Sequence, residues 1–537
     1  MFYKRIAATY TVMVFILGFL CVNIVTIFNS PAAEASEQNN RRVLEVSEKR
    51  GNIYDCNLNL LVNEEKYNAA AVAPIGESAS VMKNYLSGED YSNLISRLSK
   101  GELVLVKTGE EIEDSEGITS LSPYLRYSEN QLLTHTIGYL DTGTGQGVSG
   151  LEKSYDEYFT ENSGTLSVAY YVDALGRILS GGEDEIIYDG YNNNSGLVLT
   201  IDKEIQRIAE ECADEGKLDK GSIVILDAEN GKIKAMVSRP NFNPNEIENY
   251  LNDENSPLIN RSLTEYSVGS VFKLVVCAAA LEAGISPNFT HDCTGQIEVD
   301  GIVFHCHKLS GHGVLDMKSG FALSCNTYFI SLAQKVGKEK ILETAEKMGF
   351  GTSVDIAHSL SCDAGYLPSL NDIATSGDLA NLSFGQGKLM ASPVQIAAAF
   401  LTVASGGNYC YPTIVEGFAD ENMNVTHSEQ KPPTPVFNEK IVKQLQSFLK
   451  YSVDYGGGTL AKPEGSTAGG KTATAQTGWY KNGVEVYHAW FAGYYPADNP
   501  KYVMAILKEE GDGGSTDCAP IFRDIAEKIE AYESGGD

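Results

Sequence analysis

Basic residues are scarce in this sequence relative to acidic ones. The 537 residues include 41 Lys plus Arg against 71 Asp plus Glu, which gives a formal net charge of -30. Such a surface repels nucleic acid over most of its area, so nucleic-acid binding is excluded as a main function. Hydrophobic residues still make up 43% and charged residues 21% of the chain, a mix that is typical of folded proteins and excludes a disordered chain.

A dense cysteine framework is also missing. The ten cysteines are scattered and none of them form a C-x-x-C pair, which excludes a disulfide-rich scaffold. One pair stands out, because Cys293 and Cys306 flank two short strand-like runs around Asp300-Gly301. A hairpin at this turn brings the two cysteines opposite each other, either as free thiols or as one disulfide.

Histidine is rare as well, but half of it is concentrated in this stretch. The four histidines are His291, His305, His307 and His312. Together with the cysteines they raise the question of a zinc site, yet their spacing fits no standard pattern of zinc ligands. We therefore favour free thiols or a disulfide, and we expect neither a metal nor a cofactor.

Long hydrophobic runs are absent except at the N-terminus. The run from Ile6 to Phe28 carries no charge, is long enough to cross a bilayer once, and follows Lys4 and Arg5. A cleaved signal peptide is the alternative, because Ala33-Glu34-Ala35 resembles a small-x-small cleavage site, but the run is longer than a usual signal core. We expect residues 1–5 to stay in the cytoplasm, residues 6–28 to anchor the protein in the cell membrane, and the remainder to lie outside.

The rest of the chain is too long for one ordinary core, so more than one domain is expected. Residues 29–41 have the composition of a linker, and residues 42–165 mix strand-like runs with turns in a small, largely extended N-terminal domain. After a connecting segment at 166–195, residues 196–535 show strands, then a helical middle, then strands and a final helix. This order predicts an α+β fold, with an antiparallel sheet against helices and a helical lobe beside it.

A serine and a lysine three residues apart begin a helical pattern that is apolar on almost all sides. In a helix Ser270 and Lys273 share one face, and a serine at the helix N-terminus sits where free N–H groups stabilise negative charge. A lysine buried beside it loses its proton more easily and becomes a base. The alternative is a simple helix cap beside a surface cation, because S-x-x-K alone is a weak signal.

Further residues with matching chemistry follow in the chain. Ser324-Cys325-Asn326 lies in a turn between two helical patterns, and Lys471-Thr472-Ala473-Thr474 lies in a strand-like run. Acyl transfer needs a second hydroxyl to relay a proton, an amide to hold the substrate backbone, and a cation with a hydroxyl to hold a carboxylate. These segments supply all of them.

With these elements the chain resembles the class B penicillin-binding proteins, the single-pass transpeptidases that cross-link peptidoglycan. The likeness covers nearly the whole chain. It includes RGNIYD from Arg50, GVSGLEKSYDEYF from Gly147, DALGR from Asp173, LTIDKEIQ from Leu199, SFGQGKLMASPVQIAAAF from Ser383 and AWFAGYYP from Ala489. The resemblance implies a transpeptidase domain of the penicillin-binding and serine β-lactamase type, with residues 42–165 as a pedestal or dimerisation domain.

The resemblance also implies roles for individual residues. Ser270 is then the acylated nucleophile, Lys273 its base, Ser324 the proton relay and Asn326 a substrate anchor. For binding, Lys471 and Thr472 hold the terminal carboxylate of the donor peptide, and the backbone N–H groups of Ser270 and Thr474 form the oxyanion hole. The implied substrates are stem peptides ending in D-Ala-D-Ala, the implied inhibitors are β-lactams, and the implied partner is a polytopic glycan polymerase.

Two departures from the family pattern bear on this reading. Ala473 stands where the family usually has glycine, which adds a methyl group where backbone and ligand approach closely. Tyr266-Ser267-Val268-Gly269 lacks the usual proline before the glycine, which loosens a turn. Two alternatives to the transpeptidase stay open: a carboxypeptidase or β-lactamase-like hydrolase using the same serine, and a non-catalytic scaffold, which Ala473 favours.

Overall fold

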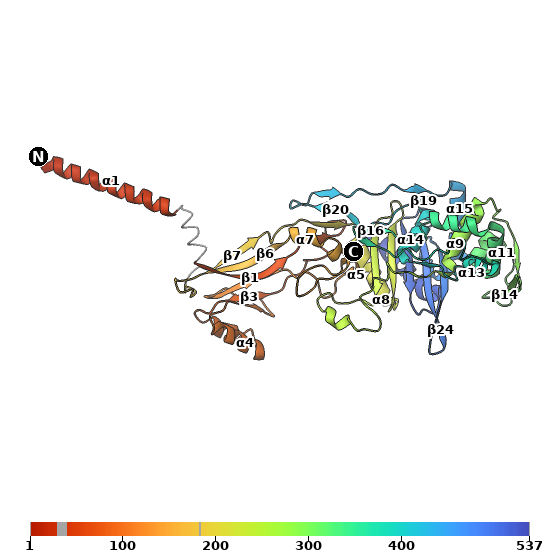
Figure 1. Cartoon of the computed structure of the whole chain (residues 1–537), viewed down its shortest axis with the longest axis horizontal. Coiled ribbons are helices and arrows are strands. Elements are labelled where there is room, and N and C mark those ends of the chain that lie inside the picture. The colour runs from red at the N-terminus through yellow and green to blue at the C-terminus, as the bar shows by residue number, and fades with distance from the viewer. Residues whose placement is uncertain (1, 29–39, 182–183, 536–537) are drawn as a thin grey trace. The chain divides into compact units, whose positions relative to one another are not determined.

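A computed structural model describes residues 2–28, 40–181 and 184–535, which form two compact units (Figure 1). Unit 1 comprises Met1–Arg50, Asn63–Arg126 and Asn162–Asn193, and unit 2 comprises Gly51–Val62, Tyr127–Glu161 and Asn194–Asp537. Unit 2 thus draws in two segments that sequence order alone placed in the N-terminal domain. Most of the predicted linker at 29–41, and the small-x-small site at 33–35, lie outside the described residues.

The N-terminal helix α1 (Phe2–Phe28) contains the long apolar run. Its large apolar side chains are exposed, and in the part of the chain that the structure describes it is the one helix long and apolar enough to cross a membrane. Exposure of so many apolar side chains has a large cost in water, whereas lipid removes that cost. The helix therefore fits a single-pass membrane anchor.

Unit 1 contains two small antiparallel sheets with alternating side chains. One sheet has the strand order β1-β6-β7 and the other β4-β3-β5. Their inner faces share a core that includes Val46, Ala71, Leu121, Val168 and Tyr170. The strands are β1 (Arg41–Lys49), β3 (Ala69–Val72), β4 (Val104–Lys107), β5 (Ile118–Leu121), β6 (Gly164–Tyr171) and β7 (Glu185–Asp189); the helices are α3 (Ser78–Met82) and α4 (Gly88–Leu98).

Unit 2 is built on a five-stranded antiparallel sheet with the order β10-β9-β25-β24-β23. Alternate residues of β9 serve two cores: Ile223 and Ile225 face α8 and α16, whereas Val224 and Leu226 face the core that contains α9 and α14. The sheet therefore has helices on both faces. The bounds are α8 (Lys203–Glu215), β9 (Gly221–Asp227), β10 (Ile233–Arg239), α14 (Pro393–Ala404), β23 (Gly469–Lys481), β24 (Val484–Tyr495), β25 (Tyr502–Lys508) and α16 (Ala519–Glu533).

A lobe of helices lies at one end of this sheet (Figure 1). Its helices are α9 (Lys273–Glu282), α10 (Met317–Ala322), α11 (Asn326–Val336), α12 (Lys338–Lys347), α13 (Ser376–Ser383) and α15 (Glu439–Tyr455). Every residue of α9 from Lys273 to Ala280 is buried, which explains why its sequence is apolar on all sides. The predicted α+β fold, with antiparallel sheet and helical lobe, is confirmed.

Short elements complete unit 2. They are β2 (Asn52–Tyr54), α5 (Thr134–Ile137), α6 (Gly150–Ser154), α7 (Asp156–Glu161), β8 (Gly196–Leu199), η1 (Ile247–Tyr250), β11 (Tyr266–Ser267), η2 (Gly269–Phe272), β12 (His291–Cys293), β13 (Gln296–Val299), β14 (Ile302–His305), β15 (Gly313–Leu315), β16 (Asp355–Ala357), β17 (Leu360–Ser361), β18 (Met390–Ala391), β19 (Asn408–Tyr409), β20 (Val415–Ala419), β21 (Val425–His427), β22 (Thr434–Pro435), η3 (Thr459–Ala461) and η4 (Gly514–Cys518).

Candidate active site

Ser270 lies in a tight turn against the edge of the large sheet. The turn is the short 3-10 segment η2, and the regular helix α9 begins only at Lys273, three residues later than the sequence predicts. The cause is Gly269, whose backbone has φ +64° and whose N–H donates to the carbonyl of Gly385 at 2.9 Å. A Cβ at Gly269 would lie 2.9 Å from the Cβ of Ala475, so the close approach of η2 to β23 requires glycine.

The segment before the nucleophile is held without the proline that the family usually has. β11 pairs with β18, and the indole N–H of Trp490 on β24 donates to the carbonyl of Ser267 at 2.9 Å. Trp490 is fully buried and Ser267 half-buried, so this hydrogen bond is partly shielded from water. A short strand pair and a tryptophan therefore fix the turn.

Lys273 is fully buried and binds the predicted middle motif. Its Nζ donates to the backbone O of Ser324 at 2.7 Å, to Ser324 Oγ at 3.2 Å and to Asn326 Oδ1 at 2.8 Å. Burial lowers the pKa of Lys273 to about 7, and nearby thiols oppose this shift only in part. Near neutral pH the amine therefore exists in both its charged and its base form.

The predicted contact between the Lys273 amine and the Ser270 hydroxyl does not appear as a hydrogen bond in the described part of the chain. A buried amine needs acceptors for its N–H groups, and Ser324 and Asn326 supply three. Ser270 itself is half-buried at the start of the same helix. The Ser270 hydroxyl therefore lies one helical turn from the Lys273 amine, and its half-buried position leaves it accessible to a second molecule.

Ser324 has an unusual backbone for a serine. Its φ is +52°, in the left-handed region, and it occupies the turn between α10 and α11. Cys325 follows as a buried residue, and α11 then begins at Asn326. The strained turn directs Ser324 and Asn326 toward Lys273, which fits the tendency of functional sites to hold such conformations.

The residues of β23 alternate between two faces. Lys471, Ala473 and Ala475 are buried, while Thr472 is half-buried and Thr474 is exposed. The Nζ of Lys471 donates to the backbone O of Thr472 at 2.8 Å. Burial, reinforced by the charge of Lys273, holds the pKa of Lys471 well below its ordinary value.

Ala473 does not share the open face of β23. Its side chain is only 3% exposed, and a Cβ at Gly269 would lie 3.4 Å from the Cβ of Ala473. The extra methyl group therefore packs behind the nucleophile turn, on the face opposite to Thr472 and Thr474. This placement removes the reason for expecting it to meet a ligand.

The predicted hairpin around Asp300-Gly301 is confirmed. β13 pairs with β14, and both turn residues have positive φ, +49° and +81°, as a two-residue hairpin turn requires. Cys293 and Cys306 lie close together as free thiols, so the alternative of a disulfide between them is not formed.

Two more side chains join these thiols, and sequence reasoning did not connect all four. The set is Cys293, Cys306, His312 and Cys325, whose ligand atoms all lie within 4.8 Å of one another. Cys325 was considered only as the middle of the motif at Ser324 to Asn326. The four positions are separated by 13, 6 and 13 residues, and this regular spacing could have indicated that the side chains lie together.

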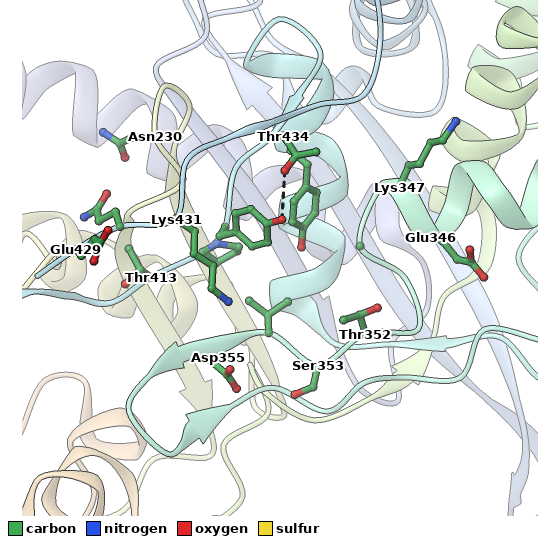
Figure 2. Close-up of a pocket in the computed structure, with 16 residues that line it drawn as sticks. Asn230, Glu346, Lys347, Thr352, Ser353, Asp355, Thr413, Glu429, Lys431 and Thr434 are labelled. Atoms are coloured by element: carbon green, nitrogen blue, oxygen red, sulfur yellow. Dashed lines mark hydrogen bonds between the residues drawn. The ribbon is translucent and has the colours of Figure 1, made fainter.

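A separate cavity of about 470 Å³ in unit 2 contains none of the predicted site residues (Figure 2). Charged side chains of both signs line it, including Glu346, Lys347 and Lys431. Tyr411 and Thr434 also line it, and their hydroxyls lie 3.2 Å apart. It offers no buried base comparable to Lys273. The candidate active site is therefore the turn of Ser270 with Lys273 and its partners.

Comparison with known proteins gives consistent results. The family model described as "Penicillin binding protein transpeptidase domain" matches residues 221–527. Stage V sporulation protein D of Bacillus subtilis is 31% identical over 450 residues, which span 79% of this chain and 67% of that protein. Peptidoglycan D,D-transpeptidase MrdA of Acinetobacter baumannii is 27% identical over 571 residues, spanning 91% of this chain and 82% of that protein.

Among solved structures, penicillin-binding protein PBP2 of Helicobacter pylori, in its complex with MreC, has the same fold. The TM-score is 0.66 at 25% identity, with 92% of this chain and 99% of that chain covered. The likeness therefore extends well beyond the residues matched by the family model, as the N-terminal motifs predict.

Proposed function

Because this chain belongs to the family of penicillin-binding protein transpeptidases, we propose that it cross-links peptidoglycan as a D,D-transpeptidase through an acyl-serine intermediate. The similar protein MrdA is named a peptidoglycan D,D-transpeptidase. The observation that carries the proposal is the environment of Lys273, a fully buried amine bound to Ser324 and Asn326 one turn from Ser270. A base with a pKa near neutrality is what a serine nucleophile requires in the absence of histidine.

In the first step Ser270 Oγ attacks the carbonyl carbon between the two D-alanines of a stem peptide, and its proton passes to the base form of Lys273. The C–N bond then breaks, and Ser324 relays a proton from the lysine to the departing D-alanine amine. In the second step an amine of a neighbouring stem peptide attacks the acyl-serine. That step forms the new amide bond and returns the proton to the serine.

The remaining residues position the donor peptide. Thr472 and Thr474 lie on the accessible face of β23, so we assign the donor carboxylate to the Thr472 hydroxyl and the oxyanion to the N–H groups of Ser270 and Thr474. Lys471 lies beneath the strand and binds the Thr472 carbonyl, so its effect on the carboxylate is electrostatic. Asn326 holds the substrate backbone.

We assign the catalytic domain to the outer side of the membrane, because Lys4 and Arg5 precede the apolar run of α1 and cations stay in the cytoplasm. The part of unit 1 that follows α1 then forms the pedestal. The catalytic domain is unit 2, which also contains Gly51–Val62 and Tyr127–Glu161, and the predicted connection at 166–195 contributes most of β6 and all of β7 to the pedestal. We place the contact with a glycan polymerase on α1 and the pedestal. The structurally similar PBP2 of H. pylori forms a complex with MreC, which supports assembly of this fold with other proteins.

The test uses the full chain in detergent with a fluorescent β-lactam. We expect covalent label on Ser270, no label in Ser270→Ala, and unchanged label in the matched control Ser267→Ala. A stem peptide ending in D-Ala-D-Ala is then supplied with and without an amine acceptor. A cross-linked product supports the transpeptidase, hydrolysis alone supports the carboxypeptidase alternative, and a folded chain that takes no label refutes both.

A further inference from the structure

The hairpin of β23 and β24 extends beyond the strand that lies next to it in the large sheet (Figure 1). β25 pairs with β24 only from Ala489 to Tyr495, whereas β23 and β24 continue to pair with each other as far as Lys481 and Val484. The extension begins directly after Thr474, which pairs with Ala489. The strand that lines the candidate active site therefore continues past the five-stranded sheet.

The end of this extension carries two exposed aromatic residues, Trp479 and Tyr480, which we call the aromatic tip. They are 70% and 69% exposed, whereas Trp490, the other of the two tryptophans in the chain, is fully buried. Exposure of large rings to water has a cost in free energy, and tryptophan and tyrosine are enriched at binding interfaces. A turn that only joined two strands would need neither ring.

The aromatic tip is held by specific backbone contacts. The turn Asn482-Gly483 has φ of +54° and +81°, as a two-residue hairpin turn requires. Before the turn β23 bulges, and the bulge is closed by Thr477. Its Oγ1 donates to the carbonyl of Val486 at 2.7 Å and accepts from the N–H of Trp479 at 3.1 Å. These contacts fix the direction in which the aromatic rings project.

The two rings project to opposite faces of β23. Residues that pair directly share a face, and the pairs Thr474–Ala489 and Tyr480–Glu485 lie an even number of residues apart along β24. Tyr480 therefore shares the face of Thr474. Trp479 precedes it in the strand and projects to the other face, against which the turn η2 packs. The aromatic tip thus borders the edge of β23 on both faces.

The donor peptide, bound as proposed above, runs toward the aromatic tip. β23 is the last strand of the sheet, so an extended peptide can add along its outer edge. With its carboxylate at Thr472 and its reacting carbonyl at the N–H of Thr474, the donor lies antiparallel to β23, and its amino-terminal part continues toward the tip. From Ala489, opposite Thr474, to Glu485, opposite Tyr480, β24 advances four residues, or about 13 Å.

The donor has a matching length. A stem peptide is attached through its amino terminus to a sugar of the glycan strand. On the order of four residues lie between this sugar and the reacting bond, and they span at most about 13–14 Å when extended. We propose that Trp479 and Tyr480 form a subsite for the glycan strand of the donor, which their rings bind while the peptide reaches Ser270. This inference rests on the proposed function.

Stacking on sugar rings is the chemistry that the aromatic tip offers. The face of an aromatic ring carries partial negative charge, and the C–H groups on the flat face of a sugar ring pack against it. The carboxylate of Glu485, which pairs with Tyr480, accepts from Gln476 at 3.0 Å and from Tyr487 at 2.9 Å and adds an acceptor for sugar hydroxyls. An anionic bilayer is a poorer match, because it repels this carboxylate.

The first experiment gives two donors to the full chain in detergent. One is a free stem peptide ending in D-Ala-D-Ala, and the other is the same peptide attached to a short glycan strand that is not cross-linked. We expect Trp479→Ala and Tyr480→Ala each to raise KM for the glycan-linked donor about fivefold or more with kcat unchanged, because they remove binding that is equal in the ground and transition states. The KM for the free peptide and the rate of β-lactam acylation should stay within about twofold of the wild type.

The matched control is Tyr188→Ala, which removes an exposed tyrosine from β7 in unit 1 and should change the kinetics of neither donor. Melting temperatures of all three variants should equal that of the wild type, because the side chains that they remove are exposed.

The second experiment measures binding without turnover. Because Trp490 is buried, a ligand at the aromatic tip changes the emission of Trp479. In Ser270→Ala, which cannot be acylated, the glycan-linked donor should shift the tryptophan emission to shorter wavelength until the shift saturates. The free peptide should leave the emission unchanged, and Trp479→Phe in the same background should lose the shift.

Equal increases in KM for both donors would overturn the sugar subsite, because they would show that the tip acts on the active site itself. An unchanged KM for the glycan-linked donor in both folded variants would also overturn it and would assign the exposed rings to contact with a protein or a membrane. A wild-type chain that takes no β-lactam and turns over neither donor would refute the proposed function instead.

Discussion

The pKa of Lys273 leads to a specific pH dependence of acylation. With a pKa of about 7, the base form makes up about 9% of the lysine at pH 6, 50% at pH 7 and 91% at pH 8. If Lys273 is the base for Ser270, the second-order rate constant for acylation should rise about tenfold from pH 6 to pH 8 and then level off. For a lysine with an ordinary pKa, the fraction of the amine in the base form at pH 7 would be about three orders of magnitude smaller.

Other ionisable groups surround the amine and enter the same profile. They are Lys471 on β23, Cys277 one turn along α9, and the thiols of Cys306 and Cys325. Raising the pH removes the proton of Lys273, so the predicted change is an increase of rate with pH. A loss of charge on Lys471 at higher pH would weaken carboxylate binding and appear in the KM for a peptide rather than in the acylation step.

The assay follows the acylation of the full chain by a fluorescent β-lactam in stopped flow between pH 6 and pH 9. Lys450→Met serves as a control, because this lysine lies near the surface, where it pairs with Asp498 at 2.7 Å, and the variant should retain the profile. A rate that is flat over this range, or that begins to rise only near the pKa of an ordinary lysine, would refute the assignment of Lys273 as the base.

Three substitutions test the architecture of the turn. Gly269→Ala should lower the free energy of unfolding by about 2 kcal/mol and slow acylation at least tenfold, because it combines a positive φ with a contact of 2.9 Å to the Cβ of Ala475; wild-type melting and labelling would contradict this. Trp490→Phe should destabilise the protein by about 1 kcal/mol and reduce labelling, since the half-buried Ser267 loses the donor to its carbonyl; an unchanged melting temperature would count against it. Ala473→Gly should cost about 1 kcal/mol through the lost buried methyl group yet change the acylation rate less than about twofold, and a large gain in rate would show that the methyl group obstructs the ligand.

Much of the fold could be predicted because its elements carry local signals. The antiparallel sheet, the apolar helix after Ser270 and the hairpin at Asp300-Gly301 follow from the period of hydrophobic residues and from turn chemistry. The family was recognisable because the three catalytic elements are short contiguous motifs. The structure brings two of them into direct contact through the hydrogen bonds of Lys273 to Ser324 and Asn326.

What could not be predicted depends on contacts between distant segments. The sequence around Lys273 does not indicate that its amine donates hydrogen bonds to residues more than fifty positions away. Nor does the sequence around Ala473 indicate that its methyl group lies near Gly269. The 3-10 start of the helix likewise depends on Gly269, which has a positive φ, accepts the close approach of Ala475 on β23 and donates a hydrogen bond to Gly385. The proximity of Cys325 to Cys306 could not be predicted for the same reason, because the two residues are 19 positions apart in the chain.

The large sheet has a consequence for how the protein can be made. β9 pairs directly with β25, with residues 228–501 between them. The β9–β10 and β23–β24 pairs can form earlier, but β25 lies between them in the sheet, so they cannot be joined until Tyr502–Lys508 has been synthesised. Closing so long a loop is entropically costly and slows folding. With the membrane orientation proposed above, a chain exported during synthesis reaches the outer side before the five-stranded sheet is complete. Stop codons before β25 should consequently yield chains that are degraded rather than weakly active.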